Sequence, residues 1–356
     1  MFTRRLEAIR QRITESRLQG LLVTSLPNIQ YLTGFTGSNA CLLLFPDRAL
    51  FFTDHRYKIQ AAKEVKNAEP IVVPGSLAEA VSTKLLHSRR TRIGFEPDSV
   101  SVAAFRNLDR AVRRTKFVPM SGIIEQIRMC KDEEEISKIR RAAEITDRVF
   151  NKILAILKPG VRELEIAAEI VYWHRRFGAD SDAFDPIVAG GDRGALPHAR
   201  ASANRLRRGD MVTIDMGCRV EGYHSDLTRT VALGKPSAEM KKIYGVVLDT
   251  QRKAIDKAQA GIAARALDSE ARKMIRAKGY GRYFNHSLGH GLGLEVHEMP
   301  RVSSKSMDIL QLTSVITIEP GIYIPKVGGV RIEDDVVIRQ KGCEVLNKSP
   351  RELIVV

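Results

Sequence analysis

Four apolar, strand-like segments in the second half of the chain carry carboxylates, and no other feature restricts the fold as strongly. The segments are MVTIDMGCRV, YHSDLTRTVAL, VITIEPG and GVRIEDDVVI. An ionised carboxylate in apolar surroundings costs several kcal/mol unless it is paired or bound to a cation. We therefore expect the fold to bring these acids together around positive charge.

Strand periodicity assigns the acids to particular faces. Asp215 alternates with the apolar residues of MVTIDMG, so it points to the opposite face. Asp226 shares a face with Thr228, and Glu333 shares one with Arg331. Each acid alone has an ordinary explanation, because Asp215 could cap a turn and Glu333 could pair with Arg331. Their combination favours a common site.

The stretch HSLGHGLGLEVHEMP adds three histidines. His286 and His290 are four residues apart, which is the spacing of two zinc ligands on one helical turn. The glycines around His290 disfavour a helix, because each costs about 1 kcal/mol there relative to Ala. We predict an extended or turning backbone, in which the glycine-flanked His290 could supply a single nitrogen ligand. One imidazole and several carboxylates suit two divalent ions, although a single buried histidine can also be part of a core.

The chain is long enough for two domains, since 356 residues exceed the about 250–300 at which single cores stop growing. Residues 1–125 alternate helix-like segments with strand-like ones such as GLLV, ACLLLF and PIVV, which predicts an α/β domain. A long amphipathic helix then follows in KDEEEISKIRRAAEITDRVFNKILAILKPG, with Asp132 as its N-cap and Pro159-Gly160 as its end. We place the boundary before this helix and predict an α+β domain over residues 126–356.

Composition is that of a soluble globular protein, and a cytoplasmic location is expected. No apolar run reaches the about 18 residues that span a bilayer, and MFTRRLEAIRQRIT lacks the apolar core of a signal peptide. The net charge of +15 is spread along the chain without interleaved aromatic residues, so we expect a solvated basic surface and no nucleic-acid partner. The four cysteines form no CxxC pair, which favours free thiols.

The second half of the chain resembles the pita-bread metallopeptidases. The resemblance is carried, in this order and spacing, by the motifs DMG with SDLTRT, HSLGHGLGLEVHEMP, TIEPGIY and GVRIEDD. That family includes aminopeptidase P, prolidase, methionine aminopeptidase and creatinase. YLTGFTGSNACLLL and FFTDHRY resemble its creatinase-type N-terminal domain, which methionine aminopeptidases lack. The resemblance implies a creatinase-like domain over residues 1–125, a pita-bread catalytic domain over residues 126–356, and a homodimer.

The resemblance also implies a ligand set for two divalent metal ions: Asp215, Asp226, His290, Glu319 and Glu333. Asp226 and Glu333 would bridge the ions, Asp215 would bind one of them, and His290 and Glu319 would complete the other. Glu319 would also pass on the proton of a water placed between the ions. Four carboxylates favour Mn²⁺, while Co²⁺, Fe²⁺ and Zn²⁺ also fit. Creatinase keeps the fold but lacks this set, and here all five positions are filled.

Three further residues are expected to act beside the metals. His198 in ALPHAR and His297 in VHEMP match the histidines that flank the substrate in the Xaa-Pro branch. Arg331 is expected either to contact a substrate carbonyl or carboxylate, or to balance the charge of Asp334 or Asp335.

The activity implied first is that of an Xaa-Pro aminopeptidase, which removes an N-terminal residue that precedes proline. The alternative is an Xaa-Pro dipeptidase, or prolidase, which needs a closed site for the free carboxylate of a dipeptide. The compact chain, with no inserted loop, favours the aminopeptidase. A more distant alternative is a non-catalytic scaffold for peptides or nucleic acid, which the complete ligand set disfavours. The expected partners are proline-containing peptides or dipeptides, and no membrane.

Overall fold

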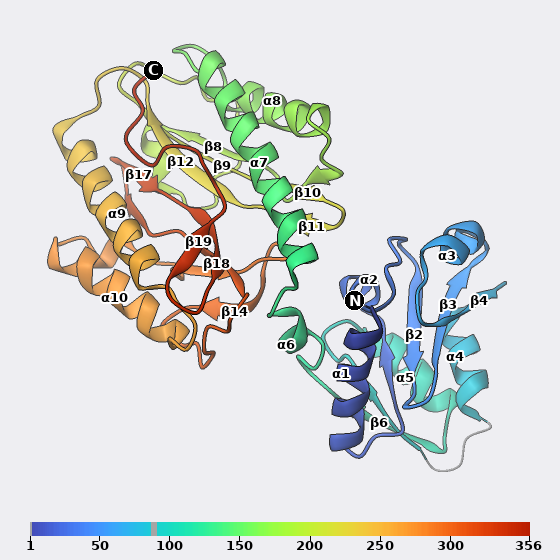
Figure 1. Cartoon of the computed structure of the whole chain (residues 1–356). Helices are drawn as coiled ribbons and strands as arrows, with labels where there is room; N and C mark the ends of the chain where they lie inside the picture. The colour runs from blue at the N-terminus through green and yellow to red at the C-terminus, as the bar shows by residue number, and fades with distance from the viewer. Residues whose placement is uncertain (1, 87–90) are drawn as a thin grey trace. The chain divides into compact units, whose positions relative to one another are not determined.

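The computed structural model describes residues 2–86 and 91–356. The chain divides into two compact units, Met1–Arg128 and Met129–Val356, which are here called the N-terminal and C-terminal units (Figure 1). Within the described residues, no helix is both long and apolar enough to cross a membrane.

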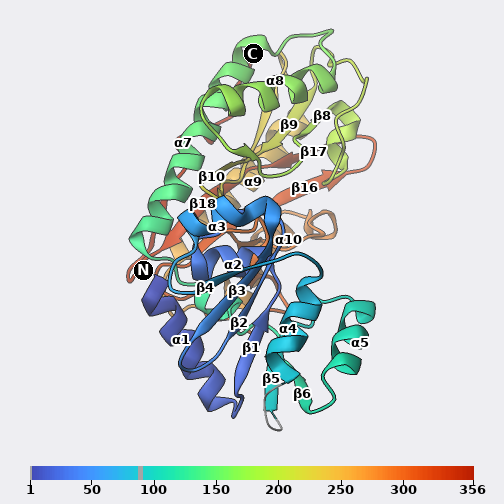
Figure 2. The same cartoon turned by 90° about the vertical axis from the view of Figure 1, so that its right-hand side faces the viewer.

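The N-terminal unit is a mixed sheet covered by helices. Its elements are α1 (Phe2–Glu15), β1 (Gly20–Val23), α2 (Leu26–Thr33), β2 (Ala40–Leu44), β3 (Ala49–Asp54), the 3₁₀ turn η1 (His55–Tyr57), α3 (Lys58–Glu64), β4 (Glu69–Val73), α4 (Leu77–Leu86), β5 (Thr91–Phe95), α5 (Val102–Ala111), β6 (Thr115–Pro119) and α6 (Glu125–Arg128). The strand order is β4-β3-β2-β1-β5-β6. Figure 2 shows α4 and α5 on one side of this sheet and α1 on the other.

The C-terminal unit begins with two helices and continues with strands. Its first half comprises α7 (Glu133–Ile156), α8 (Glu163–Arg176), β7 (Ser181–Asp182), β8 (Ile187–Gly190), η2 (Gly191–Ala195), β9 (Met211–Met216), β10 (Cys218–Val220), β11 (Tyr223–His224) and β12 (Leu227–Ala232). The predicted start of α7 is confirmed, because the Asp132 side chain accepts from the backbone N–H of Glu135 and the Glu135 side chain accepts from that of Asp132.

The second half repeats the order of two helices followed by strands. It comprises α9 (Ala238–Lys257), α10 (Ala264–Ala277), η3 (Gly281–Tyr283), β13 (Gly289–Gly291), β14 (Glu298–Val302), β15 (Val315–Ile318), β16 (Gly321–Ile324), β17 (Gly328–Arg331), β18 (Asp334–Ile338) and β19 (Cys343–Val345). The predicted extended backbone around His290 is confirmed, since this residue is the middle one of β13.

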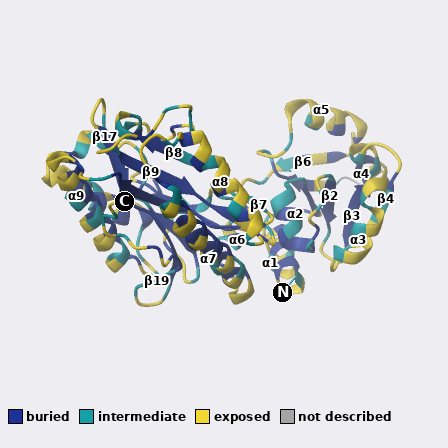
Figure 3. Ribbon diagram, turned by 90° about the horizontal axis from the view of Figure 1, so that it is seen from above, coloured by how far each residue is buried: buried dark blue, intermediate teal, exposed yellow. Residues whose placement is uncertain are grey.

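Strands occupy the centre of the C-terminal unit and the helices cover them. One cluster of buried apolar side chains joins α7 and α8 to β8, β9 and β12, and a second joins α9 and α10 to β15–β18. Figure 3 shows β8 and β9 as buried strands beside these helices. The predicted combination of an α/β and an α+β domain is confirmed. The elements α2, β6 and α6 were not predicted, because each is short and α2 has a proline at its start.

Candidate metal centre

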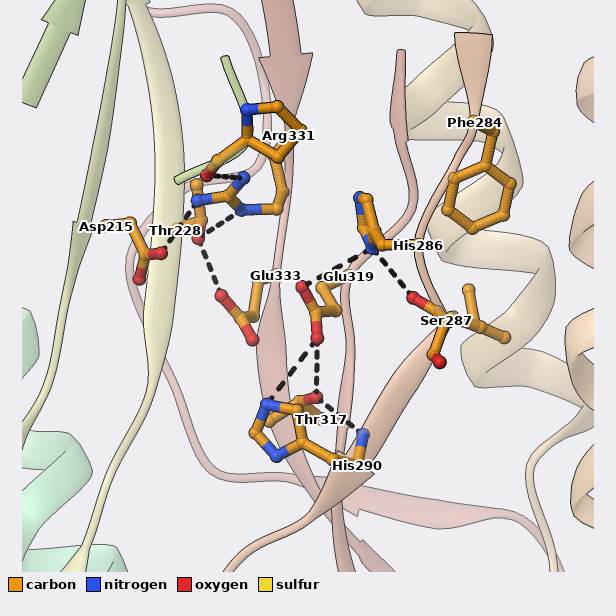
Figure 4. Close-up of polar contacts among 12 residues, drawn as sticks. Asp215, Thr228, Phe284, His286, Ser287, His290, Thr317, Glu319, Arg331 and Glu333 are labelled. Carbon is orange, nitrogen blue, oxygen red and sulfur yellow. Dashed lines mark hydrogen bonds and ion pairs between the residues drawn. The ribbon is translucent and has the colours of Figure 1, made fainter. Parts of the chain in front are cut away.

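The five predicted ligands lie at neighbouring positions on the central strands of the C-terminal unit. Asp215 is the penultimate residue of β9 and stands opposite Thr228 of the antiparallel strand β12. Asp226 immediately precedes β12, and Glu333 immediately precedes β18. Glu319 follows the last residue of β15, next to β13 with His290. Strand ends from both halves of the unit therefore meet at one place (Figure 4).

Three of these side chains are close enough to share one ion. Asp226, His290 and Glu333 each offer a ligand atom, and these atoms lie within 4.8 Å of one another. The His290 Nε2 atom is 3.5 Å from Glu319 Oε1 and 3.7 Å from Asp226 Oδ2. The predicted association of the histidine with acids from distant segments is therefore present in the fold.

The ring of His290 is oriented as a metal ligand requires. Its Nδ1 is 3.1 Å from the carbonyl oxygen of Gly291, so Nδ1 carries the proton and donates it there. The Nε2 atom is then left with a free lone pair directed at the acids. Metal-binding histidines commonly use one ring nitrogen in this way to fix the tautomer of the other.

Two buried carboxylate oxygens of the site have no hydrogen-bond partner in the part of the chain that the structure describes: Asp215 Oδ1 and Asp226 Oδ1. Buried polar atoms are rarely left unsatisfied in native proteins. Four carboxylates and one imidazole supply the hard oxygen donors and the single nitrogen that a pair of divalent ions accepts. The residues present therefore fit divalent metal ions.

The charge balance of the site supports the same conclusion. Burial, followed by the charge of Glu333, raises the pKa of both Asp226 and Glu319 well above their ordinary values. Burial, followed by the charge of Asp215, raises the pKa of Glu333 to about 8. Like charges that are buried side by side cannot all ionise unless a cation joins them.

Stability without metal is expected to fall as the pH rises. Because the pKa of Glu333 is about 8 in the folded protein and 4.5 for a glutamate free in water, the folded chain binds more protons between these values. The contribution of Glu333 to the free energy of unfolding then decreases from about pH 4.5 to about pH 8. The lowered pKa values of His286 and His290 act in the opposite direction, but only up to about pH 6.5. Metal displaces these protons, so the rise in Tm caused by Mn²⁺ should grow over this range.

Thermal melts with EDTA and with excess Mn²⁺ at a series of pH values check this expectation. The variant Glu333→Gln should show a shallower dependence of Tm on pH in EDTA. A metal-free Tm that rises between about pH 6 and about pH 8 would contradict the assignment.

Arg331 is fully enclosed and contacts the metal-ligand set directly. Its Nη2 donates to Asp215 Oδ2 at 2.7 Å, and its Nε donates to Thr228 Oγ1 at 3.0 Å. The Thr228 hydroxyl in turn donates to Glu333 Oε2 at 2.6 Å. The Arg331 Nη1 donates to the hydroxyl of Tyr323 at 2.8 Å (Figure 4 shows the contacts to Asp215 and Thr228).

The predicted charge balance between Arg331 and Asp334 or Asp335 is wrong. Asp334 pairs with Arg229 at 2.7 Å and with Arg351, and Asp335 accepts the backbone N–H of Asp226 at 3.0 Å. The reason is that β17 ends at Arg331 and β18 begins at Asp334, so the two segments are separate strands rather than one.

His286 lies beside the acids, but both of its ring nitrogens make hydrogen bonds to other groups. Its Nδ1 donates to the carbonyl oxygen of Ser287 at 2.8 Å, and its Nε2 accepts from the Tyr323 hydroxyl at 2.9 Å. Its Nδ1 is 4.0 Å from Glu319 Oε2. Burial, then the charge of Arg331, lowers the pKa of His286 to about 3, so this ring is neutral.

The two other predicted histidines are exposed at the edge of the centre. The ring of His297 stands edge-on to that of His290, with 4.3 Å between centroids. It also lines a widely open surface pocket of about 420 Å³ together with Arg219, His224 and residues 294–296. Burial lowers the pKa of His297 and the charge of His198 lowers it further, so His198 is within electrostatic range of it.

Comparison with known proteins agrees with this site. Residues 137–340 match the family described as Metallopeptidase family M24, and residues 5–130 match the Creatinase/Prolidase N-terminal domain. The chain therefore belongs to metallopeptidase family M24, in the branch that carries the creatinase-type N-terminal domain. Membership of this metallopeptidase family implies divalent metal ions.

Three similar proteins cover nearly the whole chain. The Xaa-Pro dipeptidase of Pyrococcus horikoshii is 40% identical over 340 residues, which are 96% of this chain and 95% of that protein. The structure of an Xaa-Pro dipeptidase from Bacillus anthracis has a TM-score of 0.97 at 40% identity and covers 100% of both chains. The structure of an X-Pro aminopeptidase from Thermotoga maritima has a TM-score of 0.89 at 40% identity and covers 97% of this chain and 100% of that one.

Proposed function

We propose that the chain is an Xaa-Pro dipeptidase that binds two divalent metal ions through Asp215, Asp226, His290, Glu319 and Glu333. The observation that supports it most directly is the group of buried acids around His290 Nε2, with carboxylate oxygens that lack partners among the described residues. The relatives named Xaa-Pro dipeptidase favour this reading over the aminopeptidase that was predicted first.

The length of the chain does not distinguish the two activities. The absence of an obvious inserted loop in the compact sequence favours the aminopeptidase only if a dipeptidase needs such a loop to close its site. However, the Bacillus anthracis dipeptidase covers 100% of this chain and is covered 100% by it. A protein named as a dipeptidase therefore fits within the same length.

The ions, when bound, would lower the pKa of a water and polarise the scissile carbonyl. Glu319 would accept the proton of the attacking water, and the Thr317 hydroxyl, 3.4 Å from Glu319 Oε1, would hold that carboxylate in place. His297 would donate to the peptide, because its ring adjoins His290 and is open to solvent.

Arg331 is proposed to orient the metal centre by holding Asp215 and Thr228 rather than to contact a substrate carbonyl or carboxylate. Its guanidinium already donates to Asp215, Thr228, Tyr323 and Pro197, so its remaining capacity for a ligand is small. The exposed His198 is proposed to lie across the substrate from His297. Mn²⁺ as the working metal, the homodimer and the cytoplasmic location stay predictions from the sequence.

A dipeptide is expected to be the better substrate. With Mn²⁺ present, kcat/KM for an Xaa-Pro dipeptide should exceed that for the matching Xaa-Pro-Yaa tripeptide by about tenfold or more, since a hydrogen bond to a charged group is worth about 1.5–3 kcal/mol. The amidated dipeptide Xaa-Pro-NH₂ is the matched control, because it keeps the size of the substrate and removes the carboxylate charge.

The second candidate is the Xaa-Pro aminopeptidase, which the similarity to the Thermotoga maritima enzyme favours. Faster cleavage of the tripeptide, and equal cleavage of the amidated and free dipeptides, would establish this activity and overturn the first proposal. A chain that binds no Mn²⁺ and cleaves none of these peptides would instead be a scaffold.

A further inference from the structure

One buried carboxylate outside the metal centre accepts hydrogen bonds from four residues of a single loop. Glu163 is the first residue of α8 and has no exposed surface. Its Oε1 accepts from the Gly190 N–H at 3.0 Å and from Asn204 Nδ2 at 3.1 Å, while its Oε2 accepts from the Ser202 N–H at 3.1 Å and hydroxyl at 2.7 Å. Arg193 Nε donates to both oxygens, at 3.1 and 3.0 Å.

These donors lie at the two ends of the segment 190–204, and His198 is near its middle. The backbone of α8 adds to the same attachment, because the Glu163 N–H donates to the Asn204 carbonyl at 3.1 Å and the Leu164 N–H donates to the Ser202 carbonyl at 3.1 Å. Arg193 Nη2 also donates to the carbonyl of Arg200 at 2.6 Å. These contacts therefore hold the two ends of the segment 190–204 together against the start of α8.

The same segment is attached to the metal centre at the residue before His198. Arg331 Nη1 donates to the carbonyl oxygen of Pro197 at 3.1 Å, and the same guanidinium holds Asp215. The 3₁₀ turn η2 lies directly against β17, where a Cβ on Gly329 would be 2.0 Å from the carbonyl oxygen of Gly194. Only glycine allows the two backbones to approach this closely.

The chemistry of this attachment requires a carboxylate rather than an amide. Every group that contacts the Glu163 side chain is a donor, and one of them is a cation. A buried carboxylate is tolerated when it is fully hydrogen-bonded in this way. An amide of the same size would direct two N–H groups at other N–H groups and would leave the Arg193 charge without its partner.

We propose that Glu163 is a positioning residue for His198. It fixes both ends of the segment 190–204, so that the exposed His198 is held at the substrate side of the metal centre while Arg331 holds Pro197. The inference rests on the proposed function, since His198 needs a peptide to contact. A displacement of about 1 Å at such a contact lowers the rate by up to about 100-fold.

The test compares Glu163→Gln with Glu165→Gln in the full-length, Mn²⁺-loaded protein. Glu165 is in the same helical turn, but its carboxylate accepts from the Arg162 N–H at 2.7 Å and Arg162 Nη2 at 2.9 Å, and it does not touch the loop. We expect Glu163→Gln to lower kcat/KM for an Xaa-Pro dipeptide by about 10- to 100-fold and Glu165→Gln to change it less than about twofold. The affinity for Mn²⁺ should stay within about twofold in both variants.

Two readouts separate positioning from a general loss of structure. Trypsin should cleave after the exposed Arg200 or Arg205 faster in Glu163→Gln than in Glu165→Gln. In a double-mutant cycle, Glu163→Gln is combined with His198→Ala and kcat/KM is measured for each protein. The free-energy losses in kcat/KM of the two single variants should not add in the double variant, because both substitutions remove the same positioned imidazole. If Glu163→Gln fails to fold, Ser202→Ala removes the 2.7 Å hydroxyl contact to Glu163 and the 3.1 Å contact that this hydroxyl accepts from the Asn204 N–H. The other donors to Glu163 remain, so this variant should show smaller changes in kcat/KM and in trypsin cleavage, in the same direction.

The inference is overturned if the losses in kcat/KM of Glu163→Gln and His198→Ala are additive, or if trypsin cleaves Glu163→Gln no faster than Glu165→Gln. It is also overturned if Glu163→Gln is as active as the wild type. If instead the wild type cleaves no Xaa-Pro peptide, the proposed function fails, and the trypsin comparison still decides whether Glu163 holds the loop.

Discussion

The variant Glu333→Gln is expected to lose about 10³-fold or more in kcat/KM for an Xaa-Pro dipeptide while its metal-free form becomes more stable. The glutamine keeps the size of the side chain and can still accept from the Thr228 hydroxyl, which is 2.6 Å from Glu333 Oε2 in the native protein. It removes one negative charge from a site in which Glu333 raises the pKa of both Asp226 and Glu319. Loss of metal affinity and relief of repulsion therefore follow from the same change.

The measurements are steady-state kinetics, metal content after dialysis, and the Tm in EDTA. Glu344→Gln is the matched control, because Glu344 is half-exposed on β19 and pairs with Arg140 and Arg339 away from the centre. Its activity and metal content should remain those of the wild type. A Glu333→Gln protein that keeps full metal content and activity would show that Glu333 is not a ligand.

The variant Arg229→Met is expected to cause the largest loss of stability, about 3–5 kcal/mol, because it removes one of the two cationic partners of the buried Asp334 and leaves buried carbonyl oxygens without their donor. The Arg229 side chain is almost completely buried and donates to Asp334 Oδ1 at 2.7 Å. It also donates to the carbonyl oxygens of Ser349 at 2.7 Å and Pro350 at 2.8 Å. The substitution removes all of these contacts together.

Urea unfolding in EDTA measures this loss without a contribution from metal. Arg252→Met is the control, since Arg252 pairs with Glu352 on the surface and both side chains are largely exposed. Exposed ion pairs contribute about 0–1 kcal/mol, so the control should unfold close to the wild type. Equal unfolding midpoints for the two variants would show that the Arg229 contacts do not stabilise the fold.

Local patterns in the sequence were sufficient to predict much of the architecture. The acids after Asp132 predicted the start of α7, because a capping box depends only on residues three apart. The glycines around His290 predicted an extended backbone, and β13 is extended there. The association of the acids was predictable because buried carboxylates have few alternatives to a shared cation.

Contacts between distant segments could not be predicted in the same way. Period-two alternation placed Arg331 and Glu333 on one face of one strand, but a break separates β17 from β18. The partner of Arg331 is Asp215, which is 116 residues away. Glu163 is separated by 27–41 residues from the donors that surround it, so a glutamate at the start of a helix is the only local signal for it.

The three consecutive acids Glu333, Asp334 and Asp335 also make the fold intolerant of a change in chain length at this point. Glu333 accepts from Thr228, Asp334 accepts from Arg229, and Asp335 accepts from the Asp226 N–H. A one-residue insertion or deletion before β18 would exchange all three partners at once. Natural length variation should therefore be excluded from this junction and tolerated in the exposed turn before β19.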